Sequence, residues 1–572
     1  MANNGDTKRE FKVGNANIRG LGSFHKTLPH NEYGEVEPVA FDKLVAATEG
    51  NGTTFAEVPS GVVGAAQLVN PQAGLASDRL THHPASYAMP PAPRVLGLTT
   101  AAEMTELYWM ALLRDLPFDQ FDVSPEISTA AAEIHAVFKD AVGDIGDEGH
   151  LKTGVDVPGP AGQLASITKH NIFRLGLPGE DVGPLVSQFF IRSANYGTQL
   201  IDQMQLPYIK DRDYLTTFAE WLFTQKSGRD SSGQAYPQAN ENNAANFEAK
   251  RRYISTPRDL ARFVNKDALH QAYFNATILL LSGGAKWTPG NPYSDAGALK
   301  PREAGFGVLG GPHILALVSE VATRALKVVW NQKWQVNLRL RPEAYGGLVQ
   351  VQNIGIGGVN GKRAYGLPAF VSSTTAAAHI KAMHGSLLLP IAFTPGSPAH
   401  PAYGAGHATV AGICVTILKA YFQTIDSTGC PIKFNTLVER DAPYGAGTTI
   451  STYVTGVTNQ PGGDVGVRTP LLTSVADQLT IEGELNKLAM NVAMGRSIGG
   501  VHWRTDNTRS LALGEALAAQ ILADATTDCN ERPTFEFRSF SRLANGKPKS
   551  IKIQQGRVYV EDMQVDTNSS QL

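Results

Sequence analysis

Cysteine is scarce in this sequence. Its 572 residues include three cysteines, Cys414, Cys430 and Cys529, and no two of them form a Cys-x-x-Cys pair. Three widely spaced thiols cannot build a disulfide framework, and the missing pair excludes a zinc ribbon and a thioredoxin-like redox site. This cysteine usage is compatible with a reducing compartment.

Long apolar runs are also absent. The most apolar stretches, Ile278–Leu281 and Leu387–Phe393, are far shorter than the roughly 18 residues that a membrane span requires. Residues 1–11 are polar and lack the apolar core of a secretory signal peptide. We therefore expect a soluble, cytoplasmic protein with no membrane partner.

The two signs of charge nearly cancel. Fifty Lys and Arg residues against 52 Asp and Glu residues leave a net charge of -2 with His neutral. A nucleic-acid-binding domain is usually basic, so this balance argues against a nucleic-acid partner. With 42% hydrophobic and 18% charged residues, the chain has enough apolar surface for a large core and is not a disordered protein.

Helical periodicity dominates the chain between residues 96 and 530, which we interpret as one helical body. Residues 1–95 show little periodicity and are predicted to form a loop-rich N-terminal arm. Residues 531–572 are predicted to form a tail with a β-hairpin, Ser550–Ile553 and Val558–Glu561. The fold is therefore predicted to be mainly α. The predicted helices are Ala101–Leu116, Pro125–Val142, Asp213–Gln225, Pro257–Ser282, His313–Trp334, Thr374–His384, Gly406–Phe422, Thr473–Val492 and Asn507–Ala525.

A cluster of cations follows one of these helices. Lys333 lies at the end of a strongly apolar segment, and Arg341 precedes Pro342. Proline disfavours a helical backbone at the residue before it, so Arg341 is predicted to be extended. Lys333 and Arg341 are then able to converge on one anion, the first as a point charge and the second as a two-pronged donor. Taken alone, the segment also fits a solvated helix end.

Small residues surround a second candidate site. His400 and the run Gly404-Ala405-Gly406-His407 stand directly before an apolar helix. A helix N-terminus offers free backbone N–H groups and the positive end of the helix dipole, which together favour anions. His407 is predicted to lie beside the bound group, although a lone histidine at a helix start is commonly a capping or surface residue.

A third segment combines a cation with another histidine. Arg496 precedes His502 by six residues, and Asp506 follows His502 by four. If this segment is helical, Asp506 lies one turn from His502 and is able to accept its ring N–H, which fixes the tautomer. The other ring nitrogen is then free to act as a nucleophile or a metal ligand.

In this order, the three segments resemble the signature shared by the vanadium-dependent haloperoxidases and the type 2 phosphatidic acid phosphatases. The similarity is strongest to the red-algal and cyanobacterial bromoperoxidases and covers about residues 210–510. Further stretches that resemble this branch are Ile254–Ala261, Gly305–His313, Glu320–Lys327 and Arg341–Glu343.

The resemblance implies a fold of two four-helix bundles that hold vanadate(V) at the base of a cleft. It implies an enzyme that oxidises bromide or iodide with hydrogen peroxide to a hypohalous acid equivalent, which halogenates small organic acceptors. The relatives form large closed assemblies, and the long arm suggests wrapping between subunits. We therefore expect a homo-oligomer that is at least dimeric.

The resemblance also assigns roles to individual residues. His502 is similar to the residue whose ring nitrogen bonds vanadium, and His407 to the general acid–base. His400 matches a second active-site histidine of the bromoperoxidases and favours bromide and iodide over chloride. The residues expected to bind the vanadate oxygens are Lys333, Arg341, Arg496 and the Gly406 amide.

The sequence departs from the family pattern at one position. The motif is usually Pro-Ser-Gly-His, and here Ala405 cannot supply the hydroxyl group of the serine. A hydrogen bond to a charged group is worth about 1.5–3 kcal/mol, so weaker cofactor retention is expected. Calcium, which occurs in algal relatives, has no assignable ligands, because the acidic residues around Asp295 and Glu303 do not match well enough.

Two other functions fit parts of the pattern. A phosphatase on the same scaffold would use His502 as nucleophile and His407 to protonate the leaving group. A non-catalytic helical assembly protein would bind phosphate structurally, and the missing serine at Ala405 supports this alternative. The stretches typical of the bromoperoxidases, together with His400, favour the peroxidase.

Overall fold

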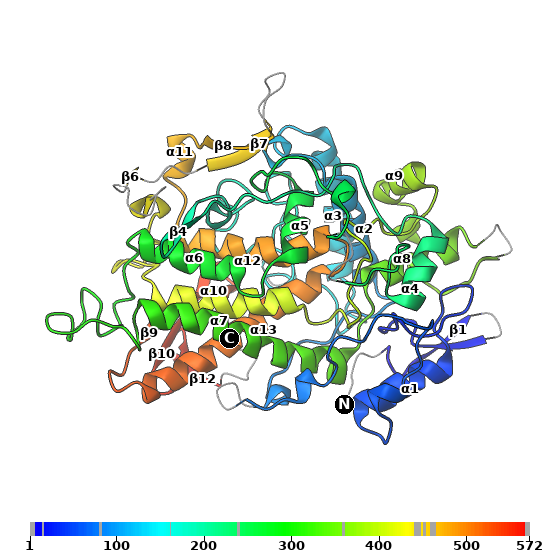
Figure 1. Ribbon diagram of the computed structural model, residues 1–572, viewed down its shortest axis with the longest axis horizontal. Coiled ribbons are helices and arrows are strands. Elements are labelled where there is room, and N and C mark those ends of the chain that lie inside the picture. Colours follow the sequence, from blue (N-terminus) through cyan, green and yellow to red (C-terminus); the bar gives the residue numbers. More distant parts are fainter. Residues whose placement is uncertain are drawn as a thin grey trace.

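The computed structural model describes the chain except for residues 1–5, 14–15, 79–82, 161, 237–240, 357–360, 440–447, 450–452, 458–464 and 567–572. Within the described residues the protein is mainly helical, as predicted (Figure 1). The helices are α1 (Pro38–Glu49), α2 (Leu98–Leu112), α3 (Pro125–Val142), α4 (Phe218–Ser227), α5 (Pro257–Lys266), α6 (Gln271–Ser282), α7 (Gly311–Asn331), α8 (Pro342–Asn353), α9 (Thr375–His384), α10 (Gly406–Tyr421), α11 (Thr473–Ala476), α12 (Ile481–Ile498) and α13 (Arg504–Asp528).

Helix α10 lies at the centre of the body and packs against α7, α12 and α13 (Figure 1). Every residue of α10 except His407 is buried, which explains its apolar sequence on all faces. Two glycines allow the close contact with α13. A Cβ added at Gly412 would lie 2.3 Å from the Leu511 carbonyl oxygen, and one at Gly514 would lie 2.3 Å from that of Thr409. The absence of both side chains therefore sets the distance between two helices that bear on the candidate site.

Several predicted helix boundaries were wrong. The predicted helix 257–282 is two helices, because the chain extends at Asp267 between α5 and α6. The predicted helix 473–492 is likewise divided between α11 and α12. Helices α1 and α8 were not predicted, and both begin at a proline, which is favoured in the first turn of a helix.

The predicted C-terminal hairpin is confirmed as part of a larger antiparallel sheet. Strands β10 (Pro548–Gln554) and β11 (Arg557–Val560) pair through the turn at Gln555 and Gly556, whose φ angles are both positive. Strands β9 (Phe535–Arg542) and β12 (Met563–Val565) extend the sheet to the order β12-β11-β10-β9. The paired strands elsewhere are β1 (Glu10–Val13) with β2 (Ala16–Arg19), β3 (Ala194–Tyr196) with β4 (Gln199–Ile201), β5 (Val438–Glu439) with β6 (Thr448–Thr449) and β7 (Tyr453–Val457) with β8 (Val465–Pro470).

The N-terminal arm is more structured than predicted, because it contains the β1–β2 hairpin and α1. Its apolar side chains Phe24 and Phe41 belong to a buried cluster with Trp334 and Leu338 from the segment after α7. The arm therefore supports one of the candidate segments directly. The division of the chain at residues 95 and 530 stays a prediction. Among the described helices, none combines the length and apolar character that a bilayer crossing requires.

Candidate functional site

The three predicted segments meet inside the helical body. The Lys333 ammonium donates to the backbone oxygens of Pro401, at 2.8 Å, and Ala402, at 3.1 Å. Arg341 donates through Nε to the His400 oxygen at 2.9 Å and through Nη1 to the Val501 oxygen at 2.7 Å. Cations of the first segment thus bind the backbone of the other two segments.

Lys333 lies in a π-helical turn, Gln332–Asn337, that directly continues α7. The Leu338 N–H closes this turn on the Lys333 oxygen at 2.9 Å, and Leu338 has a φ of +47°. Widened turns of this kind are frequent at functional sites, because they rotate one side chain out of the ordinary helical register. After the turn, Arg341 is extended, as Pro342 predicts, with φ -79° and ψ 152°.

The Arg341 guanidinium bridges two predicted site histidines. Its Nη1 lies 2.9 Å from Nε2 of His502, and its Nη2 lies 2.9 Å from Nδ1 of His400. Arginine only donates, so Nε2 of His502 must accept, whereas Nδ1 of His400 also lies 3.2 Å from the Pro401 oxygen. His502 therefore carries its hydrogen on Nδ1, where Asp506 Oδ2 accepts it at 2.9 Å. This pairing is as predicted, although His502 precedes α13 rather than belonging to it.

Arg496 lies in the last turn of α12. Its Nη1 donates to the Val264 oxygen of α5 at 2.8 Å, and it forms a hydrogen bond with Tyr236. Its Nε is buried and has no partner among the described residues. A buried N–H group without an acceptor is costly, so this atom is suited to a bound oxyanion.

The electrostatics of the cluster favour an anion. Lys333, Arg341 and Arg496 are at most 2% exposed, and among the described residues no carboxylate lies within ion-pairing distance of any of them. Burial and the neighbouring Arg341 lower the pKa of Lys333 well below its usual range. Burial and the neighbouring Arg496 lower the pKa of Arg341 to about 9. Asp506 and Glu343 oppose these shifts only from a distance. Gathering three cations without a directly paired carboxylate is unfavourable, and an oxyanion bound among them would relieve it.

The two histidines that contact Arg341 are neutral. Burial and the nearby cations Arg341 and Lys333 lower the pKa of His502 well below its usual value of 6.5. The pKa of His400 is lowered in the same way, by burial and then by Lys333 and Arg341. Neutral imidazoles have a lone pair available, which is the form that binds a metal.

Helix α10 begins at Gly406, as predicted. Its first internal hydrogen bond runs from the Thr409 N–H to the Ala405 oxygen at 3.0 Å, so the amides of residues 406–408 precede the helical ladder. A Cβ at Gly406 would lie 3.2 Å from the ring of Trp330, which also packs against the His400 ring at 4.9 Å. Trp330 was not singled out from the sequence, where it is one apolar residue among many in α7.

His407 points toward an acid that the sequence did not identify. Its Nε2 lies 3.1 Å from Asp267 Oδ1, and the His407 side chain is 26% exposed. Asp267 lies in the break between α5 and α6, inside the segment predicted to be one helix. A cavity of about 250 Å³ borders Asp267 and is lined by Phe190, Met204 and Phe263 among others. His407 is therefore the least buried of the predicted site histidines, with a carboxylate to orient its ring.

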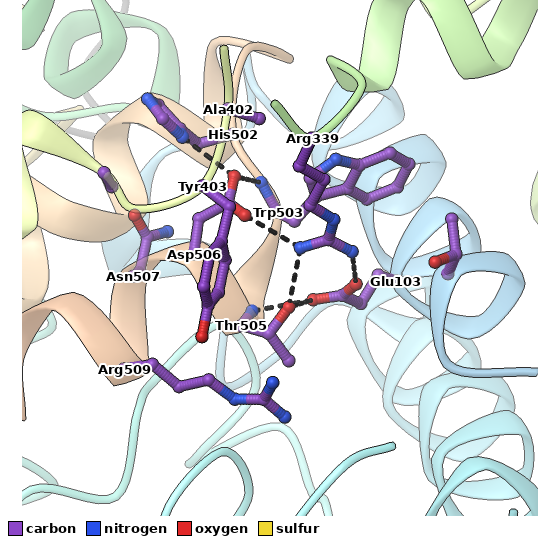
Figure 2. A network of polar contacts seen from close by, with 12 residues as sticks. Glu103, Arg339, Ala402, Tyr403, His502, Trp503, Thr505, Asp506, Asn507 and Arg509 are labelled. Atoms are coloured by element: carbon purple, nitrogen blue, oxygen red, sulfur yellow. Dashed lines mark hydrogen bonds and ion pairs between the residues drawn. The ribbon is translucent and has the colours of Figure 1, made fainter. Parts of the chain in front are cut away.

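A buried polar network lies behind His502 (Figure 2). Asp506 accepts from His502 and also from Arg339 Nη1, at 2.7 Å, and Arg339 Nη2 donates to Glu103 of α2 at 2.8 Å. Burial raises the pKa of Glu103, and Arg339 and the Thr505 donors oppose this shift. Neither Arg339 nor Glu103 was predicted, because nothing in the sequence indicates that positions 236 residues apart are in contact.

A calcium site is not evident in the described part of the chain. No group of three or more His, Cys, Asp or Glu side chains there is placed to hold a metal ion. Asp295, considered in the sequence, forms ion pairs with Lys286 and Lys300 on the surface.

Comparison with known proteins places the chain in a family. A family model described as the VCPO second helical-bundle domain matches residues 313–531, in agreement with the expected two-bundle fold. A structure titled as the homohexameric second vanadate-dependent bromoperoxidase (AnII) from Ascophyllum nodosum has a TM-score of 0.76 and 28% identity. It covers 96% of this chain and 86% of that one.

Sequence relatives agree. The vanadium-dependent bromoperoxidase of Corallina pilulifera is 31% identical, over 91% of this chain and 90% of its own length. The vanadium-dependent bromoperoxidase of Corallina officinalis is 32% identical, over 82% of this chain and 78% of its own length. A vanadium-dependent bromoperoxidase of Ascophyllum nodosum is 31% identical, over 91% and 85%. With identity and coverage at this level, and with its predicted site segments brought together, the chain belongs to the family of vanadium-dependent bromoperoxidases.

Proposed function

We propose that this protein is a vanadate-dependent haloperoxidase. It would oxidise bromide and iodide with hydrogen peroxide to a hypohalous acid equivalent that halogenates small organic acceptors. The observation that carries the proposal is the arrangement of three buried cations without a carboxylate partner, among the described residues, beside the neutral His502. This is an environment for a multiply charged oxyanion with one nitrogen ligand.

Two structural features support the fit of vanadate. Arg496 Nε is a buried donor with no acceptor among the described residues. Glycine at position 406 keeps a Cβ out of the space beside Trp330, next to the first amides of α10. We assign His502 Nε2 as the vanadium ligand and Lys333, Arg341, Arg496 and the Gly406 amide as donors to the oxygens. When bound, vanadate supplies a Lewis acid that activates peroxide without changing its own oxidation state.

The protein side chains contribute proton transfer and orientation. His407 is assigned as the base that takes a proton from hydrogen peroxide, and Asp267 orients its ring from 3.1 Å. His400 is held by Arg341 through both its ring and its backbone oxygen, and we assign it to the halide-binding side of the site. Burial of the cations excludes water and strengthens their pull on the bound oxyanion.

A homo-oligomer is proposed for the intact protein, because the relative of known structure is titled homohexameric. Size-exclusion chromatography with light scattering tests this proposal, and a monomeric mass contradicts it.

A cytoplasmic location is proposed from the cysteines, which are all free.

Bromination by the vanadate-depleted protein at graded orthovanadate concentrations tests the function. We expect bromination of phenol red to appear with vanadate and to saturate at one vanadium per chain. In a phosphatase, vanadate would instead inhibit the hydrolysis of p-nitrophenyl phosphate. Bromination that is independent of vanadate, or phosphatase turnover that vanadate abolishes, would overturn the proposal.

A further inference from the structure

The hydrogen bond between His502 and Asp506 is the first link of a longer buried chain. In Figure 2, Arg339 lies between two carboxylates, with Asp506 on one side and Glu103 on the other. We propose that Glu103 and Arg339 are positioning residues for His502, which act through Asp506 to hold the Nδ1 hydrogen and leave Nε2 as an electron-pair donor. This inference rests on the proposed function, because it concerns the residue assigned to vanadium.

The geometry of Glu103 requires the ionised carboxylate. Its Oε1 accepts from both the N–H and the hydroxyl of Thr505, each at 2.7 Å, and its Oε2 accepts from Arg339 at 2.8 Å. All three partners donate, so a protonated Glu103 would face donors on every side. The side chains of Glu103 and Asp506 are fully buried, and that of Arg339 is 3% exposed.

The charge of Glu103 determines how strongly Asp506 binds His502. Asp506 shares its negative charge between Arg339 and His502, and Glu103 neutralises part of the Arg339 charge. Burial alone would lower the pKa of Arg339, but Glu103 and Asp506 outweigh it and raise the pKa. Without the charge of Glu103, Arg339 would draw more strongly on Asp506, and the Nδ1 hydrogen of His502 would have a weaker acceptor. A weaker acceptor makes Nε2 a poorer ligand.

Helix α2 provides a matched control three residues away. Glu106 is also buried and forms an ion pair with an arginine, in which Nη2 of Arg504 lies 2.5 Å from Oε1 of Glu106. Arg504 otherwise donates to backbone oxygens, including that of Arg174 at 3.0 Å, and makes no described contact with Asp506. Glu106→Gln therefore removes an equally buried carboxylate charge from a pair whose side chains form no described hydrogen bond with Glu103, Arg339 or Asp506.

The test measures the dissociation constants of vanadate and of inorganic phosphate on the vanadate-depleted full-length protein, by equilibrium dialysis. Both anions bind the cations, but only vanadate is expected to bond to Nε2, so the ratio of the two constants isolates the contribution of His502. Glu103→Gln should raise the dissociation constant of vanadate, relative to that of phosphate, by about tenfold. This is the lower end of what outer-shell changes cause at metal sites. Glu106→Gln should leave the ratio within about twofold of the parent value.

Each outcome of this test is decisive. A parent protein that does not bind vanadate refutes the proposed function itself. A parent that binds vanadate, with an unchanged ratio in Glu103→Gln, refutes the positioning role alone. An equal change in Glu103→Gln and Glu106→Gln also refutes it. If Glu103→Gln does not fold, Thr505→Val decides, since the Thr505 hydroxyl accepts from Arg339 at 2.9 Å and donates to Glu103 at 2.7 Å. In Thr505→Val the ratio of the vanadate to the phosphate dissociation constant should rise about threefold, as expected for one lost hydrogen bond. An unchanged ratio in this variant contradicts the proposal.

Discussion

Nη1 of Arg341 lies 2.9 Å from Nε2 of His502, the nitrogen assigned to vanadium. The same guanidinium reaches His400 with its other terminal nitrogen. A cation and a prospective ligand atom thus face each other across a buried contact, with Asp506 behind the imidazole. Burial lowers the pKa of His502 most, and the contact adds to it, because a proton on Nε2 would lie against the Arg341 cation.

The first prediction concerns His502. His502→Ala should abolish both vanadate binding at micromolar concentrations and bromination, because it removes the only proposed bond to vanadium. Metal analysis after dialysis and the phenol red assay measure the two effects. His170→Ala, which changes a histidine on the exposed surface, is the control. Parental bromination by His502→Ala would refute the ligand assignment.

A second prediction separates binding from catalysis at His407. His407→Ala should retain vanadate, since the cations and His502 remain, but should lose about 10²- to 10⁴-fold in bromination rate, as expected for a missing general acid–base. Asp267→Asn should reduce the rate less, because it disturbs only the orientation of the ring. Steady-state kinetics and bound vanadium are measured together. Loss of vanadium from His407→Ala would mean that the roles of His407 and His502 are confused.

A third prediction addresses the missing serine. Ala405 is buried directly before the first turn of α10, and its N–H donates to Ser510 Oγ at 2.8 Å. Ala405→Ser should lower the dissociation constant of vanadate about tenfold, since a hydrogen bond to a charged group is worth about 1.5–3 kcal/mol. Ala411→Ser, a buried substitution farther along the helix, is the control. Equal affinities for vanadate in the parent and Ala405→Ser would show that the hydroxyl is not needed here.

A fourth prediction uses the buried pair His25 and His30 of the N-terminal arm, whose rings share a contact of 2.8 Å. Burial lowers the pKa of His25 to about 4, and burial and the neighbouring His25 lower that of His30 well below its usual value. The unfolded chain therefore binds protons that the folded chain excludes. The two neutral histidines therefore contribute stability to the folded state above about pH 6.5, and this contribution is lost as the pH falls toward 4.

As the pH falls from 7 to 5, protonation of His25 in the unfolded chain should by itself reduce the free energy of unfolding by about 2 kcal/mol. Urea unfolding at both pH values measures the loss. The double variant His25→Gln/His30→Gln should show a correspondingly smaller loss. An identical pH dependence in the double variant and the parent would contradict the assignment of these two histidines.

The local features of the site were predictable from the sequence. Pro342 determines the extended backbone at Arg341, small residues before an apolar helix mark the start of α10, and the four-residue spacing of His502 and Asp506 brings them into contact. The Gln555-Gly556 turn marks the C-terminal hairpin. Each depends on backbone preferences or contacts within a few residues, which the sequence alone encodes.

The remaining features depend on tertiary structure. Asp267 meets His407 across 140 residues, and Glu103 meets Thr505 across 402. Burial removes the water that would otherwise solvate these groups, so each needs a partner from a distant segment, and the packing of the helices decides which partner it finds. The net charge of -2 likewise does not reveal the buried cations, because a total charge does not say where the individual charges lie in the fold. The sequence by itself determined the helical body and the chemistry of its three motifs, and the folded packing alone decided how these motifs are oriented and held.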